Sequence, residues 1–98
     1  QKIIQVFKDY KTSMIAIAVF KCESGLDPFA VSKTGDVGVA QIHWPLWKDK
    51  VKEEFGYNIV DMFNVDKNLE VAKWIYDRSG SFEPWTTYKN GVYISCLN

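Results

Sequence analysis

The chain has 98 residues, which is the size of one domain and too short for two separate hydrophobic cores joined by a linker. Hydrophobic residues make up 47% and charged residues 24%, as in globular proteins and unlike disordered or low-complexity chains. The 12 basic and 12 acidic side chains give a formal net charge of zero, so we expect neither nucleic acid nor an anionic membrane surface as a partner. The longest apolar run, residues 14–20, is far shorter than the roughly 18 residues of a bilayer span, so no membrane span is expected.

The first part of the chain predicts two helices. Apolar residues recur at helical spacing over residues 2–10, and residues 11–13 then offer an N-cap for the next segment. The second helix, residues 13–23, is apolar on two flanks. A helix with that pattern is expected to lie at the centre of the core.

The rest of the chain predicts a loop followed by further helices. Residues 24–38 are rich in Gly, Asp, Ser and Thr, which is typical of loops. One helix is expected from Leu46 to a stop at Gly56, and another from a cap at Asp66 to Ser79, before Gly80. Residues 92–94 form the only strand-like piece of the tail. The pattern therefore predicts an all-α domain without internal repeats.

The two cysteines, Cys22 and Cys96, are too far apart for a C-x-x-C metal or redox motif. A disulfide between them would close a loop of most of the chain and stabilise the fold by roughly 4 to 5 kcal/mol. The alternative is a pair of reduced, partly buried thiols in a cytosolic protein. We favour the disulfide and, with it, an oxidising compartment.

Glu23 lies in the last turn of the predicted central helix. A carboxylate at a helix C-terminus faces the negative end of the helix macrodipole, and partial burial removes the water that would stabilise its charge. Both effects would raise the pKa of Glu23 and keep it protonated as a general acid near neutral pH. The alternative is a glutamate that simply reaches solvent at a frayed helix end.

The residues after this glutamate form a recognisable pattern. Residues 23–32 read Glu-Ser-Gly-Leu-Asp-Pro-Phe-Ala-Val-Ser, and residues 35–42 read Gly-Asp-Val-Gly-Val-Ala-Gln-Ile. The two blocks resemble the signature of the lysozyme-like lytic transglycosylases, E-S-x-x-x-P-x-A-x-S followed by G-x-x-G-L-x-Q-I or near variants. The resemblance covers about residues 15–96 and implies a single lysozyme-like domain over residues 1–98, in which Glu23 is the sole catalytic acid and base.

The same region is similar to a second group of proteins. Residues 22–25 read Cys-Glu-Ser-Gly, as in the resuscitation-promoting factors, compact relatives in which this cysteine pairs with one near the end of the domain. Cys96 occupies the corresponding place. The resemblance therefore also implies a disulfide between Cys22 and Cys96.

The resemblance implies further site residues by position. Ser32 matches a loop serine whose hydroxyl lies near the catalytic carboxyl, and Gln41 matches a glutamine that lines the saccharide groove. Tyr88 matches the tyrosine of a Y-N-A-G motif, from which Tyr-Lys-Asn-Gly at residues 88–91 departs at two positions. Among the four tryptophans, Trp85 is the best candidate for stacking on a sugar because it lies in a turn with proline.

The function implied is cleavage of the β-1,4 bond between N-acetylmuramic acid and N-acetylglucosamine in peptidoglycan, with formation of a 1,6-anhydro ring. One alternative is a muramidase that hydrolyses the same bond with water positioned by Asp36 or another carboxylate. Another is a binding module of a cell-wall or phage virion protein that keeps the groove without turnover. In each case the partner is a peptidoglycan glycan strand and the protein acts outside the cytoplasm, in the periplasm, the cell wall, the medium or a virion.

No sequence motif for a metal, nucleotide or haem is present, so we expect no cofactor and no metal site. The only histidine, His43, precedes Trp44-Pro45, which favours a place in the groove wall or on the surface over a role as catalytic base. We expect a monomeric domain, either alone or as part of a larger protein.

Overall fold

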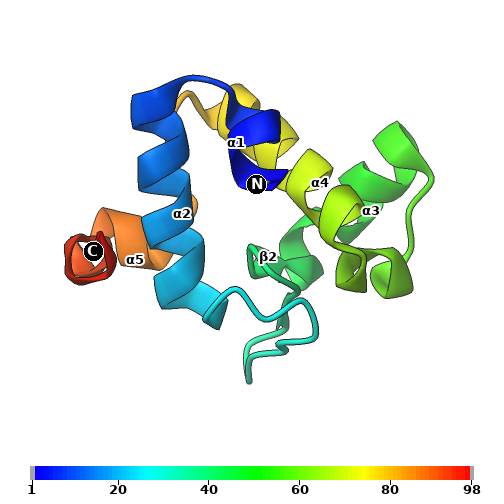
Figure 1. The fold of residues 1–98 in the computed structure, drawn as a ribbon. Helices are drawn as coiled ribbons and strands as arrows, with labels where there is room; N and C mark the ends of the chain where they lie inside the picture. Colours follow the sequence, from blue (N-terminus) through cyan, green and yellow to red (C-terminus); the bar gives the residue numbers. More distant parts are fainter. Residues whose placement is uncertain (1, 98) are drawn as a thin grey trace.

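The computed structural model describes residues 2–97 and confirms the expected mainly helical, lysozyme-like class. In chain order the elements are α1 (Lys2–Phe7), α2 (Tyr10–Ser24), β1 (Asp36–Val37), β2 (Ile42–His43), α3 (Trp44–Phe55), the 3-10 helix η1 (Ile59–Phe63), α4 (Val65–Ser79), α5 (Thr86–Lys89) and the 3-10 helix η2 (Val92–Cys96). Figure 1 shows α2, with α5 and the C-terminal end beside it, on one side of the molecule and α3 and α4 on the other. The β-hairpin lies between the two sides.

The N-cap expected at residues 11–13 is wrong. Helix α2 begins at Tyr10, and Asp9 caps it: Asp9 Oδ2 accepts a hydrogen bond from the backbone N–H of Thr12 at 2.8 Å. Lys8 adopts a left-handed φ of 66°, so the chain turns before Asp9 and α1 ends at Phe7 instead of residue 10. Ser13 consequently lies inside the helix, where it is fully buried.

The later helices end where expected but start elsewhere. The stops at Gly56 and Gly80 are confirmed. Helix α3 starts at Trp44 instead of Leu46, because a proline in the first turn needs no backbone N–H partner. Helix α4 starts at Val65 and is capped by Asn64, whose side chain accepts from the N–H of Lys67 at 3.0 Å, whereas the expected cap, Asp66, lies in the first turn.

Part of the expected loop is a two-stranded antiparallel hairpin, in which Asp36 pairs with His43 and Val37 with Ile42. The fully buried side chain of Asn68, from α4, holds the turn of this hairpin. Its Nδ2 donates to the carbonyls of Val37 at 3.1 Å and of Met62 at 2.9 Å, and its Oδ1 accepts from the N–H of Ala40 at 3.0 Å. Gly38 has a φ of 78°, and a Cβ there would collide with the Asn68 side chain and the Met62 carbonyl. The hairpin therefore depends on a contact with a helix distant in sequence.

Replacing Asn68 by alanine should destabilise the fold by about 3 kcal/mol, because three buried backbone groups lose their only side-chain partner. The free energy of unfolding in urea measures the loss. Gln5→Ala, an exposed change on α1, is the control and should stay within about 0.5 kcal/mol of wild type. An Asn68→Ala variant as stable as that control would contradict this account of the hairpin.

The C-terminal segment departs from the prediction. Residues 92–94 are part of the 3-10 helix η2 and not of a strand, since the chain enters them from Gly91 in a left-handed conformation with a φ of 81° and η2 packs on α2. The expected disulfide between Cys22 and Cys96 is confirmed, with a Cα–Cα distance of 6.0 Å. The disulfide links η2 covalently to the C-terminal part of α2.

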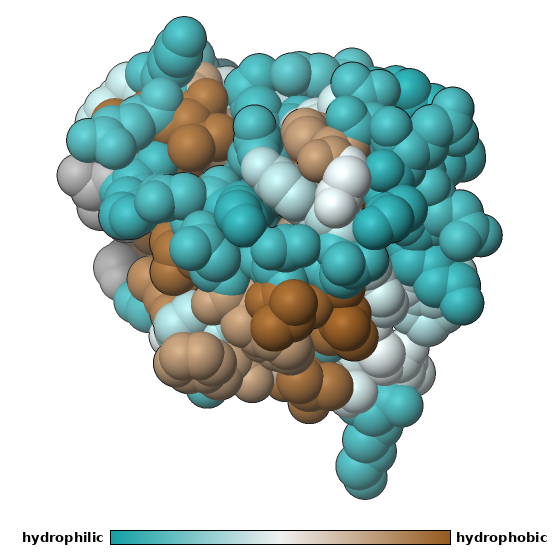
Figure 2. All heavy atoms as spheres, turned by 90° about the vertical axis from the view of Figure 1, so that its right-hand side faces the viewer, coloured by the Kyte–Doolittle hydropathy of each residue, from teal (hydrophilic) through white to brown (hydrophobic). Residues whose placement is uncertain are grey.

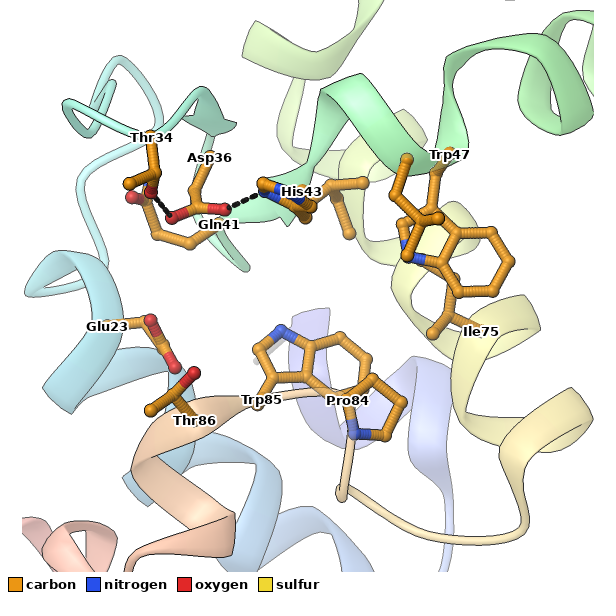
Figure 3. Close-up of a pocket in the computed structure, with 12 residues that line it drawn as sticks. Glu23, Thr34, Asp36, Gln41, His43, Trp47, Ile75, Pro84, Trp85 and Thr86 are labelled. Atoms are coloured by element: carbon orange, nitrogen blue, oxygen red, sulfur yellow. Dashed lines mark hydrogen bonds and ion pairs between the residues drawn. The ribbon is translucent and has the colours of Figure 1, made fainter.

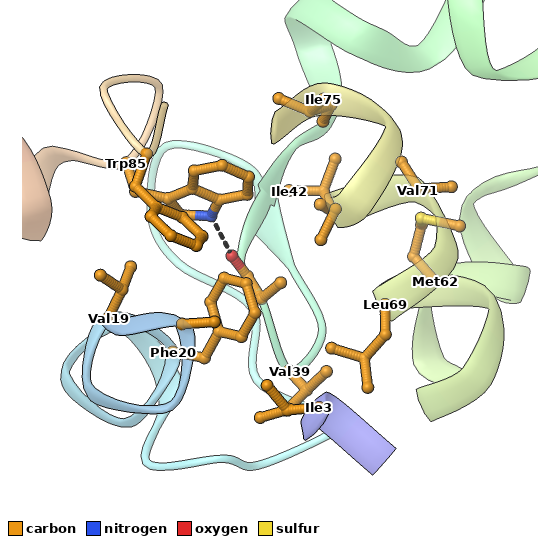
Figure 4. Close-up of a cluster of buried hydrophobic side chains, with 14 of the residues drawn as sticks. Ile3, Val19, Phe20, Val39, Ile42, Met62, Leu69, Val71, Ile75 and Trp85 are labelled. Atoms are coloured by element: carbon orange, nitrogen blue, oxygen red, sulfur yellow. Dashed lines mark hydrogen bonds between the residues drawn. The ribbon is translucent and has the colours of Figure 1, made fainter. Parts of the chain in front are cut away.

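The core is built around α2, as expected for a helix that is apolar on two flanks. Figure 4 shows Val19 and Phe20 of α2 facing Trp85 on one side and the hairpin on the other, with Leu69 and Ile75 of α4 beyond. The Trp85 indole N–H donates to the carbonyl of Ala40 at 2.6 Å. This bond joins the segment before α5 to the turn of the hairpin.

Some large apolar side chains remain on the surface. Figure 2 shows several groups of brown apolar atoms, the largest in the lower middle, on a face that is otherwise largely teal. Phe29 is 72% exposed and stacks on Phe63 of η1, and Val31 and Val60 are 62% and 69% exposed. Within residues 2–97, no helix has the length and hydropathy needed to cross a bilayer.

Candidate active site

A cavity of about 580 Å³ lies between α2, the hairpin and the segment that leads into α5 (Figure 3). One part of its lining is polar and includes Glu23, Asp36 and His43. Another part is apolar. The lining residues are Glu23, Thr34, Asp36, Gln41, Ile42, His43, Leu46, Trp47, Ile75, Pro84, Trp85 and Thr86. The cavity has the volume and mixed polarity of a small-molecule or saccharide site.

Glu23 lies in the last turn of α2, two residues before the Gly25 cap, as the sequence predicted. Burial is the main effect that raises the pKa of Glu23 above its ordinary value, and the negative charge of Asp36 acts in the same direction. Hydrogen bonds from Thr87 to Glu23 Oε2, 3.0 Å from the hydroxyl and 3.3 Å from the backbone N–H, partly oppose the rise. Glu23 is thus a half-buried carboxyl whose pKa is higher than that of an exposed glutamate.

The pKa of Asp36 is shifted in the opposite direction. Burial alone would raise its pKa, but hydrogen bonds from Ser32, His43 and Thr34 outweigh that effect and lower the pKa below the ordinary value. Ser32 Oγ and Thr34 Oγ1 lie 2.7 and 2.9 Å from Asp36 Oδ2, and His43 Nδ1 lies 2.8 Å from Oδ1. One cavity therefore contains a carboxyl with a raised pKa and a carboxyl with a lowered pKa, which is a pattern typical of acid–base sites.

Gln41 is 93% removed from solvent, with 7% of its surface exposed, and its backbone has a left-handed φ of 53°. Its side-chain amide donates to the carbonyls of Ala30 at 3.0 Å and of Gly38 at 2.9 Å. Both amide hydrogens are used in this way, so the side-chain oxygen is the polar atom that Gln41 can offer to a ligand.

The other sequence-predicted residues lie in different places. Trp85 lines the cavity, although only 4% of its surface is exposed. Ser32 bonds to Asp36 and not to Glu23, so it reaches the cavity through that carboxylate. The Tyr88 ring packs against Phe82 and Tyr93, with centroids 5.8 and 4.9 Å away, and is not part of the cavity lining.

Sequence reasoning missed two contributions to this site. Thr87, the partner of Glu23, follows Trp85 in a short Thr-Thr pair that carries no motif of its own. The apolar side chains of Leu46, Ile75 and Pro84, from α3, α4 and the proline turn, were missed because they are distant in sequence. Trp47, one of the four tryptophans considered for stacking on a sugar, lines the same cavity. His43 does lie in the groove wall, as expected. Residues 2–97 contain no group of three or more His, Cys, Asp or Glu side chains that could hold a metal ion.

The raised pKa of Glu23 predicts how the stability of a Glu23→Gln variant depends on pH. The folded protein disfavours the ionised carboxyl. Ionisation of Glu23 therefore lowers the free energy of unfolding progressively as the pH rises from below the ordinary pKa of 4.5 to above the higher pKa of the folded state. The neutral glutamine avoids this cost. The variant should therefore have a higher Tm than wild type near pH 7, and the difference should vanish near about pH 3. Thermal unfolding followed by circular dichroism tests this, and an equal difference at both pH values would contradict it.

Comparison with known proteins identifies one family. The sequence model described as "Transglycosylase SLT domain" matches residues 5–91, which is most of the chain and includes all the residues that line the cavity. No curated protein and no solved structure matches the chain significantly.

Proposed function

Because the chain belongs to the transglycosylase SLT domain family, we propose that it cleaves the β-1,4 bond between N-acetylmuramic acid and N-acetylglucosamine with Glu23 as its only acid and base. Members of this family are transglycosylases, and the family implies peptidoglycan as the substrate. The observation that carries the proposal is the half-buried Glu23 carboxyl, with its raised pKa, in the wall of the large mixed cavity.

The proposed reaction needs no water. Glu23 donates its proton to the glycosidic oxygen, the bond from that oxygen to C1 of N-acetylmuramic acid breaks, and N-acetylglucosamine leaves with a free hydroxyl. The C6 hydroxyl oxygen of N-acetylmuramic acid then bonds to C1 and gives its proton to the Glu23 carboxylate. The product has a 1,6-anhydro ring, and Glu23 is protonated again for the next cycle.

The lining of the cavity supports binding of a saccharide. The side-chain oxygen of Gln41, which accepts no hydrogen bond from residues 2–97, can accept one from a sugar hydroxyl or N-acetyl N–H. Trp85 and its apolar neighbours can cover a sugar face or an acetyl methyl. We assign Ser32 an indirect part, through Asp36. Substrate binding by Tyr88 stays a prediction.

We place the reaction outside the cytoplasm. Peptidoglycan lies there, and the Cys22–Cys96 disulfide suits an oxidising compartment. The periplasm, the cell wall, the medium and a phage virion all meet these two conditions.

Hydrolysis is the second candidate, and Asp36 is the observation that favours it. Its lowered pKa keeps a carboxylate in the same cavity as Glu23, where it could position water or stabilise positive charge at C1. All of its described hydrogen bonds come from Ser32, Thr34 and His43, which occupy both oxygens and make it a weak base. We therefore keep the transglycosylase as the first proposal.

A defined oligosaccharide separates these candidates. The substrate is an oligomer of alternating N-acetylglucosamine and N-acetylmuramic acid, and the comparison is the same oligomer with the C6 hydroxyl of N-acetylmuramic acid replaced by hydrogen. A transglycosylase cuts the first and not the second, since the attacking oxygen is missing. Cleavage of both would support hydrolysis, and binding without cleavage of either would support a glycan-binding module.

A further inference from the structure

The two oxygens of the Glu23 carboxyl have different surroundings. Oε2 accepts both the hydroxyl and the backbone N–H of Thr87, at 3.0 and 3.3 Å. Oε1 has no hydrogen-bond partner in the described part of the chain. The carboxyl is therefore held at one oxygen and open at the other.

This contact is fixed by the core and not by an exposed loop. Thr87 lies two residues after Trp85, whose indole donates to the Ala40 carbonyl and packs on Phe20 of α2 with ring centroids 5.6 Å apart. Phe20, in turn, precedes Glu23 by less than one turn of the same helix. Thr87 and Glu23 are 64 residues apart in sequence and are brought together by this buried tryptophan.

We propose that Thr87 is a positioning residue for Glu23, fixing Oε2 so that Oε1 carries the acid proton and delivers it to the glycosidic oxygen. This inference rests on the proposed function of Glu23. A hydroxyl that donates to Oε2 leaves the carboxyl proton on Oε1, and it prevents the carboxyl group from rotating. After proton transfer, the same two donors stabilise the carboxylate until the C6 hydroxyl returns a proton.

The contact also sets the ionisation of Glu23. The titratable side chains that line the cavity with it are Asp36 on β1 and His43 on β2, while α5 contributes Thr86 and no titratable side chain to the lining. Burial and Asp36 raise the pKa of Glu23, and the two donors of Thr87 lower it. Loss of the Thr87 hydroxyl should therefore raise the pKa of Glu23 further.

Thr87→Val tests the proposal because valine keeps the shape of threonine and replaces the hydroxyl with a methyl group, which cannot donate a hydrogen bond. The titration of Glu23 can be followed by NMR of ¹³C-labelled glutamate side chains and assigned with Glu23→Gln. We expect the Glu23 midpoint to move to higher pH in Thr87→Val and to return to the wild-type value in Thr87→Ser. At low pH, where Glu23 is fully protonated and the rate no longer changes with pH, kcat should fall roughly tenfold in Thr87→Val, with little change in KM. Thr87→Ser should restore kcat.

Thr12→Val is the matched control. Thr12 likewise donates its hydroxyl and backbone N–H to one carboxylate oxygen, that of Asp9, at the opposite end of α2 from Glu23 and outside the cavity lining. It should leave the Glu23 midpoint unchanged. A folded Thr87→Val protein with the wild-type midpoint and rate would overturn the proposal. If the wild type released no product, the proposed function would fail while the titration would still decide whether Thr87 controls the ionisation of Glu23.

Discussion

Glu23→Gln should lower the rate of peptidoglycan cleavage by roughly 10³-fold or more, with the fold intact. Glutamine has nearly the same shape as glutamate, and its side-chain oxygen can still accept the hydrogen bonds of Thr87. It cannot give a proton to the glycosidic oxygen. The rate at which a suspension of purified cell walls loses turbidity measures the effect. Substrate binding should persist because the cavity is unchanged.

The matched control is Glu70→Gln. Glu70 is also a carboxyl that accepts a hydrogen bond from a hydroxyl, that of Tyr57, but it lies on the exposed surface of α4 and outside the cavity. Its replacement should leave the rate within about twofold of wild type, because Glu70 does not line the cavity and surface changes rarely alter stability much. Wild-type turnover by a folded Glu23→Gln protein would remove Glu23 from the mechanism.

Removal of the disulfide is expected to have the largest effect on stability. Cys22 and Cys96 are separated by 74 residues, and cross-linking a loop of that length stabilises a fold by about 4 to 5 kcal/mol in the chain-entropy model. Since small domains unfold with a total of roughly 5 to 15 kcal/mol, the double variant Cys22→Ala, Cys96→Ala should lose a large share of its stability and unfold at a much lower urea concentration. Urea titrations of the oxidised wild type and of the double variant measure the difference.

A reducing agent provides the control for that measurement. It should lower the stability of the wild type to near that of the double variant and leave the double variant unchanged, because the variant has no thiol to reduce. A double variant that unfolds at the wild-type urea concentration would show that the bond adds nothing to the fold.

Features specified by neighbouring residues could be predicted from the sequence. The ends of α3 and α4 follow from Gly56 and Gly80, which supply a backbone conformation that ends a helix. The place of Glu23 at the end of α2 follows in the same way from the glycine behind it. The disulfide was predictable because only two cysteines are present.

Features that depend on distant contacts could not be predicted in this way. The hairpin forms because the Asn68 side chain makes hydrogen bonds to the backbone of the hairpin turn, and no pattern in residues 35–43 predicts a partner on α4. The tail becomes a 3-10 helix and not a strand since it packs on α2 and is tied there by Cys96. Thr87 likewise gains its place beside Glu23 only when Trp85 enters the core.

The start of α2 was mispredicted for a local reason. Three residues in this stretch, Asp9, Thr12 and Ser13, are of types that act as N-caps. The left-handed turn at Lys8 decides between them, because it places the Asp9 carboxylate over the first free N–H groups of the helix. That backbone turn has no sequence signal, since lysine rarely adopts it.

The most direct test of the central proposal is mass spectrometry of the soluble fragments released from purified peptidoglycan by the wild type and by Glu23→Gln in parallel. We expect fragments that end in 1,6-anhydro-N-acetylmuramic acid, each lighter by one water molecule than the corresponding hydrolytic fragment, from the wild type alone. The same fragments from Glu23→Gln, or only reducing ends from the wild type, would contradict it.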